Sequence, residues 1–207
     1  MKKLTILIAL FSSLMAVNNL PAFADESAKP VADTPAAKHK MGTGLDAKSL
    51  SEAAKSAMAD MKTYKDKKSG YTVDYPSSWE IKETVPPYSF KFFAYNGQVN
   101  ANGAIDEVPA DATAEMYAAA VKEYMSSQPG YAYKIISEKP VKIAGVNGIQ
   151  RVQQITHEDF TGNQIAVYFV TNSKAYQFNG TTIAEEYSVF EPVFQKMIDS
   201  IKLENVN

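Results

Sequence analysis

The sequence SGYTVDYPSSW, residues 69–79, marks the start of a strand-rich domain. Within it Tyr71, Val73 and Tyr75 alternate with polar residues, which is the period-two pattern of a half-buried strand. Residues 76–78 (Pro-Ser-Ser) form a turn signal, and the chain continues into a second short strand at 79–81. This stretch therefore predicts a strand, a tight turn and the beginning of a second strand.

Downstream of this stretch, the sequence alternates between strand-like runs and turn residues. Asn96-Gly97 and Asn172-Ser173 are turn signals between neighbouring strands. The strand-like runs cover 89–95, 99–108, 132–143, 149–157, 164–171 and 175–182. Strands joined by such short turns are typical of an antiparallel sheet.

Two helices are predicted among these strands. We expect Asp111 to cap the first, whose apolar stripe closes before Pro129-Gly130 and consists of Tyr117, Ala120, Val121 and Tyr124. The second begins near Thr182, in capping-box spacing with Glu185, and Pro192 is expected to restart it as a first-turn residue. The order of elements predicts an α+β fold, with an antiparallel β-sheet flanked by helices.

The N-terminus has the pattern of a cleavable signal peptide over residues 1–24. Lys2 and Lys3 precede an apolar run over 4–17, and Ala22-Phe23-Ala24 is a small-x-small cleavage pattern. The run is shorter than the roughly 20 residues that span a bilayer. We therefore expect an exported protein, periplasmic or secreted, whose mature chain begins near Asp25 and has no integral membrane segment.

Residues 25–62 are predicted to form a flexible linker that contains a short helix. Prolines and small polar residues dominate up to about Leu45. Ser49 and Glu52 have capping-box spacing and are followed by apolar residues at helical intervals, which predicts a helix over 50–62. The folded domain is then expected over 63–207.

Composition excludes several classes of function. The chain has no cysteine, so disulfides, thiol catalysis and thiolate metal sites are excluded. The formal net charge is −2, and loss of Lys2 and Lys3 with the signal makes it −4. Arg151 is the only arginine. An acidic chain with one guanidinium group argues against nucleic acid as a partner, because phosphate backbones require a basic surface.

The opening stretch and the C-terminal region resemble the PsbP-like and DcrB-like superfamily of exported proteins. The first carries the Gly-aromatic, Tyr-Pro and Trp positions of the family's first strand and turn. The second carries an acidic helix start, an aromatic-Pro-aromatic stretch and a terminal Ser-hydrophobic-Lys, at 185–187, 190–194 and 200–202. The resemblance covers about 64–204. It implies an α-β-α sandwich that acts as an accessory or scaffolding part of larger assemblies, and no metal ligands of the family can be matched here.

Candidate catalytic or metal-binding groups are few. His157, Glu158 and Asp159 form a contiguous trio at an expected hairpin tip and could bind a divalent cation, whereas the simpler interpretation is a solvated loop. His39 lies between two lysines of the linker, where a solvated side chain is expected. Residues 42–47 (GTGLDA) fit a dinucleotide fingerprint, but no buried strand precedes them. No catalytic residues and no cofactor are predicted.

Tyrosines beside turns are the candidates for contact with a partner. Tyr88, Tyr131 and Tyr133 lie near predicted turns, and tyrosine is enriched at protein interfaces. Phe92 and Phe93 are adjacent in one strand, so they must face opposite sides of the sheet and one of them needs a cover.

Three functions remain open at this point. The first is a non-enzymatic binding or assembly-accessory protein of the cell envelope, with an unidentified protein partner and an unknown oligomeric state. The second is a metal-dependent or carboxylate-based hydrolase that uses His157. The third is a carrier of a small ligand in an apolar cleft between sheet and helix.

Overall fold

The structure is a computed structural model that describes residues 42–66, 70–82, 88–158 and 160–204. The predicted signal peptide, residues 25–41 of the predicted linker and Asp159 lie outside these residues. In chain order the elements are α1 (Ala47–Ala59), β1 (Met61–Lys65), β2 (Tyr71–Pro76), β3 (Glu80–Ile81), β4 (Tyr88–Ala94), the 3-10 turn η3 (Tyr95–Gly97), β5 (Val99–Glu107), α2 (Ala114–Ser127), β6 (Tyr131–Ile143), β7 (Val146–His157), β8 (Phe160–Thr171), β9 (Lys174–Ile183), α3 (Tyr187–Asp199) and β10 (Lys202–Leu203).

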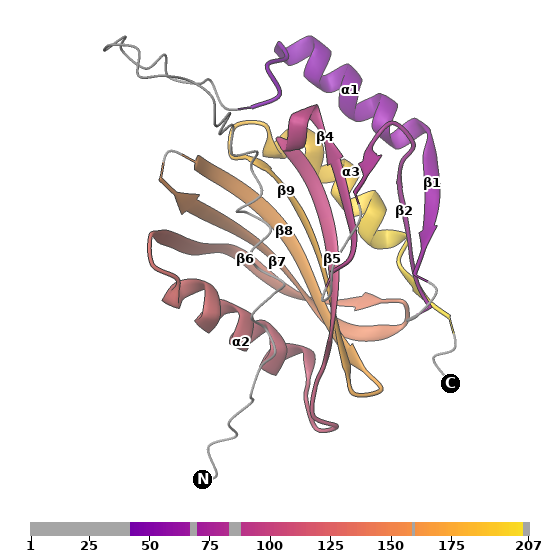
Figure 1. Cartoon of the computed structure of the whole chain (residues 1–207), viewed down its shortest axis with the longest axis vertical. Coiled ribbons are helices and arrows are strands. Elements are labelled where there is room, and N and C mark those ends of the chain that lie inside the picture. The colour runs from indigo at the N-terminus through magenta and orange to yellow at the C-terminus, as the bar shows by residue number, and fades with distance from the viewer. Residues whose placement is uncertain (1–41, 67–69, 83–87, 159, 205–207) are drawn as a thin grey trace, which may run out of the picture.

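Seven strands form one antiparallel sheet in the order β3-β4-β5-β9-β8-β7-β6, and β1-β2-β10 form a smaller antiparallel sheet. Figure 1 shows α1, α3 and the smaller sheet on one side of the large sheet and α2 on the other. The predicted α+β architecture, an antiparallel sheet flanked by helices, is confirmed. No helix of the described residues is long and apolar enough to cross a membrane.

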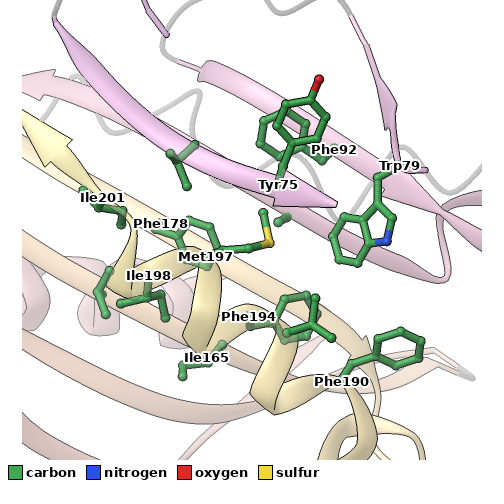
Figure 2. Packing of buried hydrophobic residues seen from close by; sticks show 14 of the residues in the cluster. Tyr75, Trp79, Phe92, Ile165, Phe178, Phe190, Phe194, Met197, Ile198 and Ile201 are labelled. Atoms are coloured by element: carbon green, nitrogen blue, oxygen red, sulfur yellow. The ribbon is translucent and has the colours of Figure 1, made fainter. Parts of the chain in front are cut away.

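The main core lies between the large sheet and α3. Phe194 and Met197 of α3 are fully buried against the sheet, and Trp79 packs edge-on to Phe194 with ring centroids 6.1 Å apart (Figure 2). Gly180 of β9 allows the Phe194 ring to lie directly on the sheet, since a Cβ at position 180 would lie 2.4 Å from that ring. Burial of one such aromatic ring contributes about 1.5–3 kcal/mol. The predicted opening strand therefore stabilises the fold by bringing Trp79 to the C-terminal helix.

A second, smaller core lies under α2. Thr113 caps this helix, and its Oγ1 accepts a hydrogen bond from the N–H of Met116 (3.3 Å). The prediction that Asp111 is the cap was therefore wrong, because Asp111 precedes the first turn by three residues. The buried stripe consists of Ala114, Tyr117, Ala118, Val121 and Met125, so Ala120 and Tyr124 of the predicted stripe lie at its margin.

The other two helices also differ from the prediction at their ends. Asp46 caps α1 by accepting from the N–H of Ser49 (2.8 Å), so the helix begins earlier than residue 50, and Met61 already belongs to β1. Strand β9 continues to Ile183, which moves the start of α3 past Thr182. Pro192 lies inside α3 at an exposed position, where water can reach the carbonyl left without a helical bond.

Candidate functional site

The predicted site residues occupy two ends of the large sheet. Tyr131 pairs with His157, which pairs in turn with Phe160, so these three residues form a row across β6, β7 and β8 at one end. Tyr133 lies two pairs further in, opposite Ile155. Tyr88 pairs with Ala104 at the start of β4, toward the opposite end of the sheet. The structure thus brings Tyr131 and His157 together and leaves Tyr88 apart from them.

Tyr131 and His157 form a stacked pair. Their ring centroids are 4.1 Å apart with an interplanar angle of 24°, and both side chains are half-buried. The geometry follows from the hairpin between β7 and β8, in which Glu158 adopts a left-handed φ of 51°. Gly130, with a φ of +78°, reverses the chain into β6 beside the imidazole. The result is an aromatic face at the end of the sheet.

The predicted metal trio is only partly described. Glu158 is exposed at the hairpin tip, His157 is stacked on Tyr131, and Asp159 lies outside the described residues. Across residues 42–204, apart from the gaps given above, no three His, Cys, Asp or Glu side chains are grouped closely enough to hold a metal ion. A metal site at this hairpin stays a prediction.

Tyr133 belongs to a hydrogen-bonded chain that crosses four strands. The Arg151 Nη1–H donates to the Tyr133 hydroxyl (3.1 Å), and that hydroxyl donates to Gln153 Oε1. Gln153 Nε2 donates to Gln164 Oε1, and Gln164 Nε2 donates to Thr181 Oγ1 (2.8 Å). Burial raises the pKa of the Tyr133 hydroxyl although Arg151 opposes the shift, so the hydroxyl keeps its proton for Gln153.

Arg151 is the centre of this chain. The residue is 2% exposed, and its guanidinium donates to Glu138 Oε2 through Nε (2.7 Å) and Nη2 (2.6 Å). Nη1 also donates to the carbonyl oxygen of Ala118 in α2 (3.0 Å), and the group lies 5.3 Å from the centroid of the Tyr168 ring. A buried charge needs such saturation of its donors. The only arginine of the sequence therefore connects α2 to the sheet.

A second row of amides runs along β9 and β5. Gln177 Nε2 donates to Asn179 Oδ1 (2.9 Å), and Asn179 Nδ2 donates to Asn102 Oδ1 (3.1 Å). All three residues are buried. Gln177 Oε1 is buried without a hydrogen-bond partner among the described residues. The sequence analysis missed both rows, although polar residues at alternate positions of three predicted strands were a signal that they share a face.

Tyr88 is covered within its own strand. It is 8% exposed, and the Lys91 ammonium lies 3.8 Å above its ring. Lys91 is half-buried, and this partial burial lowers the pKa of its ammonium. Of the adjacent phenylalanines, Phe92 is buried in the main core, whereas Phe93 faces the other side with Lys82 above its ring (4.6 Å). The two rings therefore face opposite sides of the sheet, as their adjacent positions in one strand predicted.

Comparisons with known proteins agree with this architecture. A family model described as PsbP-like protein matches residues 36–203. The solution structure of cyanobacterial PsbP (CyanoP) from Synechocystis sp. PCC 6803 is similar with a TM-score of 0.59 and 18% identity, over 70% of this chain and 94% of that one. The crystal structure of LpqN, involved in cell envelope biogenesis of Mycobacterium tuberculosis, is similar with a TM-score of 0.50 and 10% identity, over 69% and 91%. No curated protein matches the sequence significantly.

Proposed function

This chain belongs to the PsbP-like protein family, and we propose that it acts as an exported, non-enzymatic binding and assembly module of the cell envelope. A similar fold occurs in LpqN, which is involved in cell envelope biogenesis, and in a cyanobacterial PsbP. At such low identities these likenesses support a shared fold, and they do not indicate a shared partner.

The observation that carries the proposal is the half-exposed stack of Tyr131 and His157. Aromatic rings that are held rigidly and reach water on one side contribute much of the contact energy in protein interfaces. By contrast, the guanidinium of Arg151 is saturated by Glu138, Tyr133 and a backbone carbonyl. The polar chain therefore serves the fold, and the aromatic row at the sheet end is the surface we assign to a partner.

The test is affinity capture of a partner from the envelope fraction of the source organism, with the full chain as bait and mass spectrometry as the readout. We expect one protein to be recovered at near-equal stoichiometry by the wild type and lost by the Tyr131→Ala and His157→Ala variants. Ile136→Ala is the matched control, since Ile136 is 52% exposed on the same strand and outside the aromatic row.

Equal recovery by all three variants would contradict the assignment of the interface. Recovery of no partner, together with a hydrolytic turnover that His157→Ala abolishes, would favour the hydrolase alternative. A tightly bound small molecule released from the purified chain on unfolding would favour the carrier alternative.

A further inference from the structure

The segment that precedes α1 is fastened to the start of α3 by one carboxylate. Both the N–H and the hydroxyl of Thr43 donate to Glu186 Oε1, each at 2.9 Å. The N–H of Gly42 donates to Gln98 Oε1 (3.1 Å), beside the η3 turn. We call residues 42–45 the strap. It is the Gly-x-Gly sequence that fits a nucleotide fingerprint, and here its backbone binds a carboxylate of its own chain.

The strap fits only because position 42 is glycine. Gly42 has a φ of +117°, and a Cβ there would lie 2.8 Å from Ile183 Cδ1 and 2.9 Å from Glu186 Oε1. Gly44 also has a positive φ, +75°, but nothing lies within 4 Å of its Cβ position. Both positions therefore have a backbone conformation that favours glycine, but only Gly42 must lack a side chain for the strap to approach Ile183 and Glu186.

Glu186 is a buried carboxylate that the strap satisfies only in part. The residue is 9% exposed, Oε1 accepts both Thr43 hydrogen bonds, and Oε2 is buried without a partner among the described residues. Tyr95 is a titratable group near Glu186. Burial first, and the charge of Glu186 second, raise the pKa of the Tyr95 hydroxyl. Tyr95 itself has a left-handed φ of 51°, a strained conformation for a bulky residue.

Closure of the strap has opposing effects on Glu186. Closure gains two charge-assisted hydrogen bonds, whereas it also keeps Oε2 away from water. Opening would rehydrate both carboxylate oxygens and release the Thr43 donors to solvent. Because α1 is packed into the main core through Leu50, Ala54 and Ala57, opening is confined to the residues before the helix.

We propose that the strap is a conformational clasp that the negative charge of Glu186 holds shut. The closed clasp fixes where the chain N-terminal to Gly42 leaves the domain. That position is the end of the sheet that carries Tyr131 and His157, because Ile183 pairs with Gly162, two pairs inside Phe160. The open clasp exposes Glu186, Gln98 and Tyr95 as a hydrogen-bonding surface.

Amide hydrogen exchange of Thr43, measured by NMR on the full chain, tests the clasp without reference to any partner. Glu186→Gln keeps the shape and one acceptor oxygen but removes the charge, and we expect the protection of the Thr43 amide to fall roughly tenfold. Amides of β8 and β9 should keep their wild-type protection, since the change is local. Unchanged protection at Thr43, or a loss shared equally by β8 and β9, would overturn the proposal.

The two strap glycines provide a matched pair for the same measurement. Gly42→Ala and Gly44→Ala both place a Cβ at a positive φ, so the excess loss of Thr43 protection in Gly42→Ala reports the contact with Glu186 and Ile183. We expect that excess to be several-fold. Equal losses in the two variants would show that the strap is held by backbone conformation alone and would also overturn the proposal.

Discussion

The two faces of the seven-stranded sheet are built by different means. The face toward α3 carries apolar rings, such as Phe178 and Phe169, that pack against helix and small sheet. The face toward α2 has an apolar patch but also Arg151 and two rows of buried amides. Apolar packing is strong and tolerant of small shifts, whereas a polar chain is satisfied only in one strand register. We infer that the face toward α3 supplies most of the stability and that the face toward α2 specifies the register of strand pairing.

The largest expected effect is the loss of an aromatic side chain from the apolar face. Phe194→Ala removes a fully buried ring that contacts Trp79 and fills the space above Gly180. We expect a loss of about 3–5 kcal/mol in the free energy of unfolding, measured by urea denaturation. Ile81→Ala, at a residue that is 49% exposed, is the control and should cost less than about 1 kcal/mol. Similar losses for both variants would contradict the assignment of the main core.

Breaking the centre of the polar face should have the next largest effect. Arg151→Met keeps the length of the side chain but leaves Tyr133, Glu138 and the Ala118 carbonyl without their donor. Because Glu138 can turn to water, we expect a loss of about 2–3 kcal/mol in urea denaturation, below the range for a fully buried pair. Arg151→Lys separates charge from geometry and should recover less than half of this, since a lysine lacks the guanidinium fork. If Arg151→Met were as stable as the wild type, apolar contacts alone would account for the packing of α2 on this face of the sheet.

The hydrogen-bonded chain through Gln153, Gln164 and Thr181 allows a sharper test of whether the polar face acts as one connected network. Gln164→Ala leaves the Gln153 amide without its acceptor and Thr181 Oγ1 without its donor, and should cost about 1–3 kcal/mol. The double variant with Gln153→Ala should cost less than the sum of the two single variants by about 0.5 kcal/mol or more, because both lose the same bond. A double-mutant cycle in urea measures this coupling. Strict additivity would mean that the row is not a connected network.

Most strands could be predicted from the sequence, because alternation and turn chemistry are local properties. Asn172 and Ser173 both adopt the left-handed φ that a two-residue hairpin requires, as their position between two runs predicted. The predicted helix ends were less accurate, because the position of a helix cap depends on where the neighbouring strand ends. Thr182 and Glu185 have capping-box spacing, but β9 needs Thr182 to pair with Asn163 and so delays the helix.

The candidate site could be predicted only in part: Tyr131 and His157 were each singled out, but their stacking depends on the pairing of β6 with β7.

The polar face of the sheet shows a related limit. Alternation places Arg151, Gln153 and Gln164 on one face, but only the position of α2 shows that this face is buried and that Arg151 reaches the Ala118 carbonyl. The strap was missed because Thr43 and Glu186 are 143 residues apart in the chain. A contact of that separation leaves no periodic signal in a single sequence.

The smallest expected effect concerns the acid at the α2 end of the polar face. Burial raises the pKa of Asp106 above 3.8, and the Tyr117 hydroxyl, which donates to Asp106 Oδ2, only partly opposes the shift. The folded state therefore binds more protons than the unfolded state in the window from 3.8 up to the folded pKa, so Asp106 lowers stability as the pH rises through it. Asp106→Asn removes the titrating carboxyl group and keeps an acceptor oxygen for the Tyr117 hydroxyl. In urea denaturation at several pH values between 3.5 and 7, we expect the variant to be at least as stable as the wild type at pH 7, with an advantage that shrinks toward pH 3.5. An advantage of the wild type that grows with pH would mean that the charged carboxylate is favoured in the fold, and that this end of the polar face stabilises charge as Arg151 does at its centre.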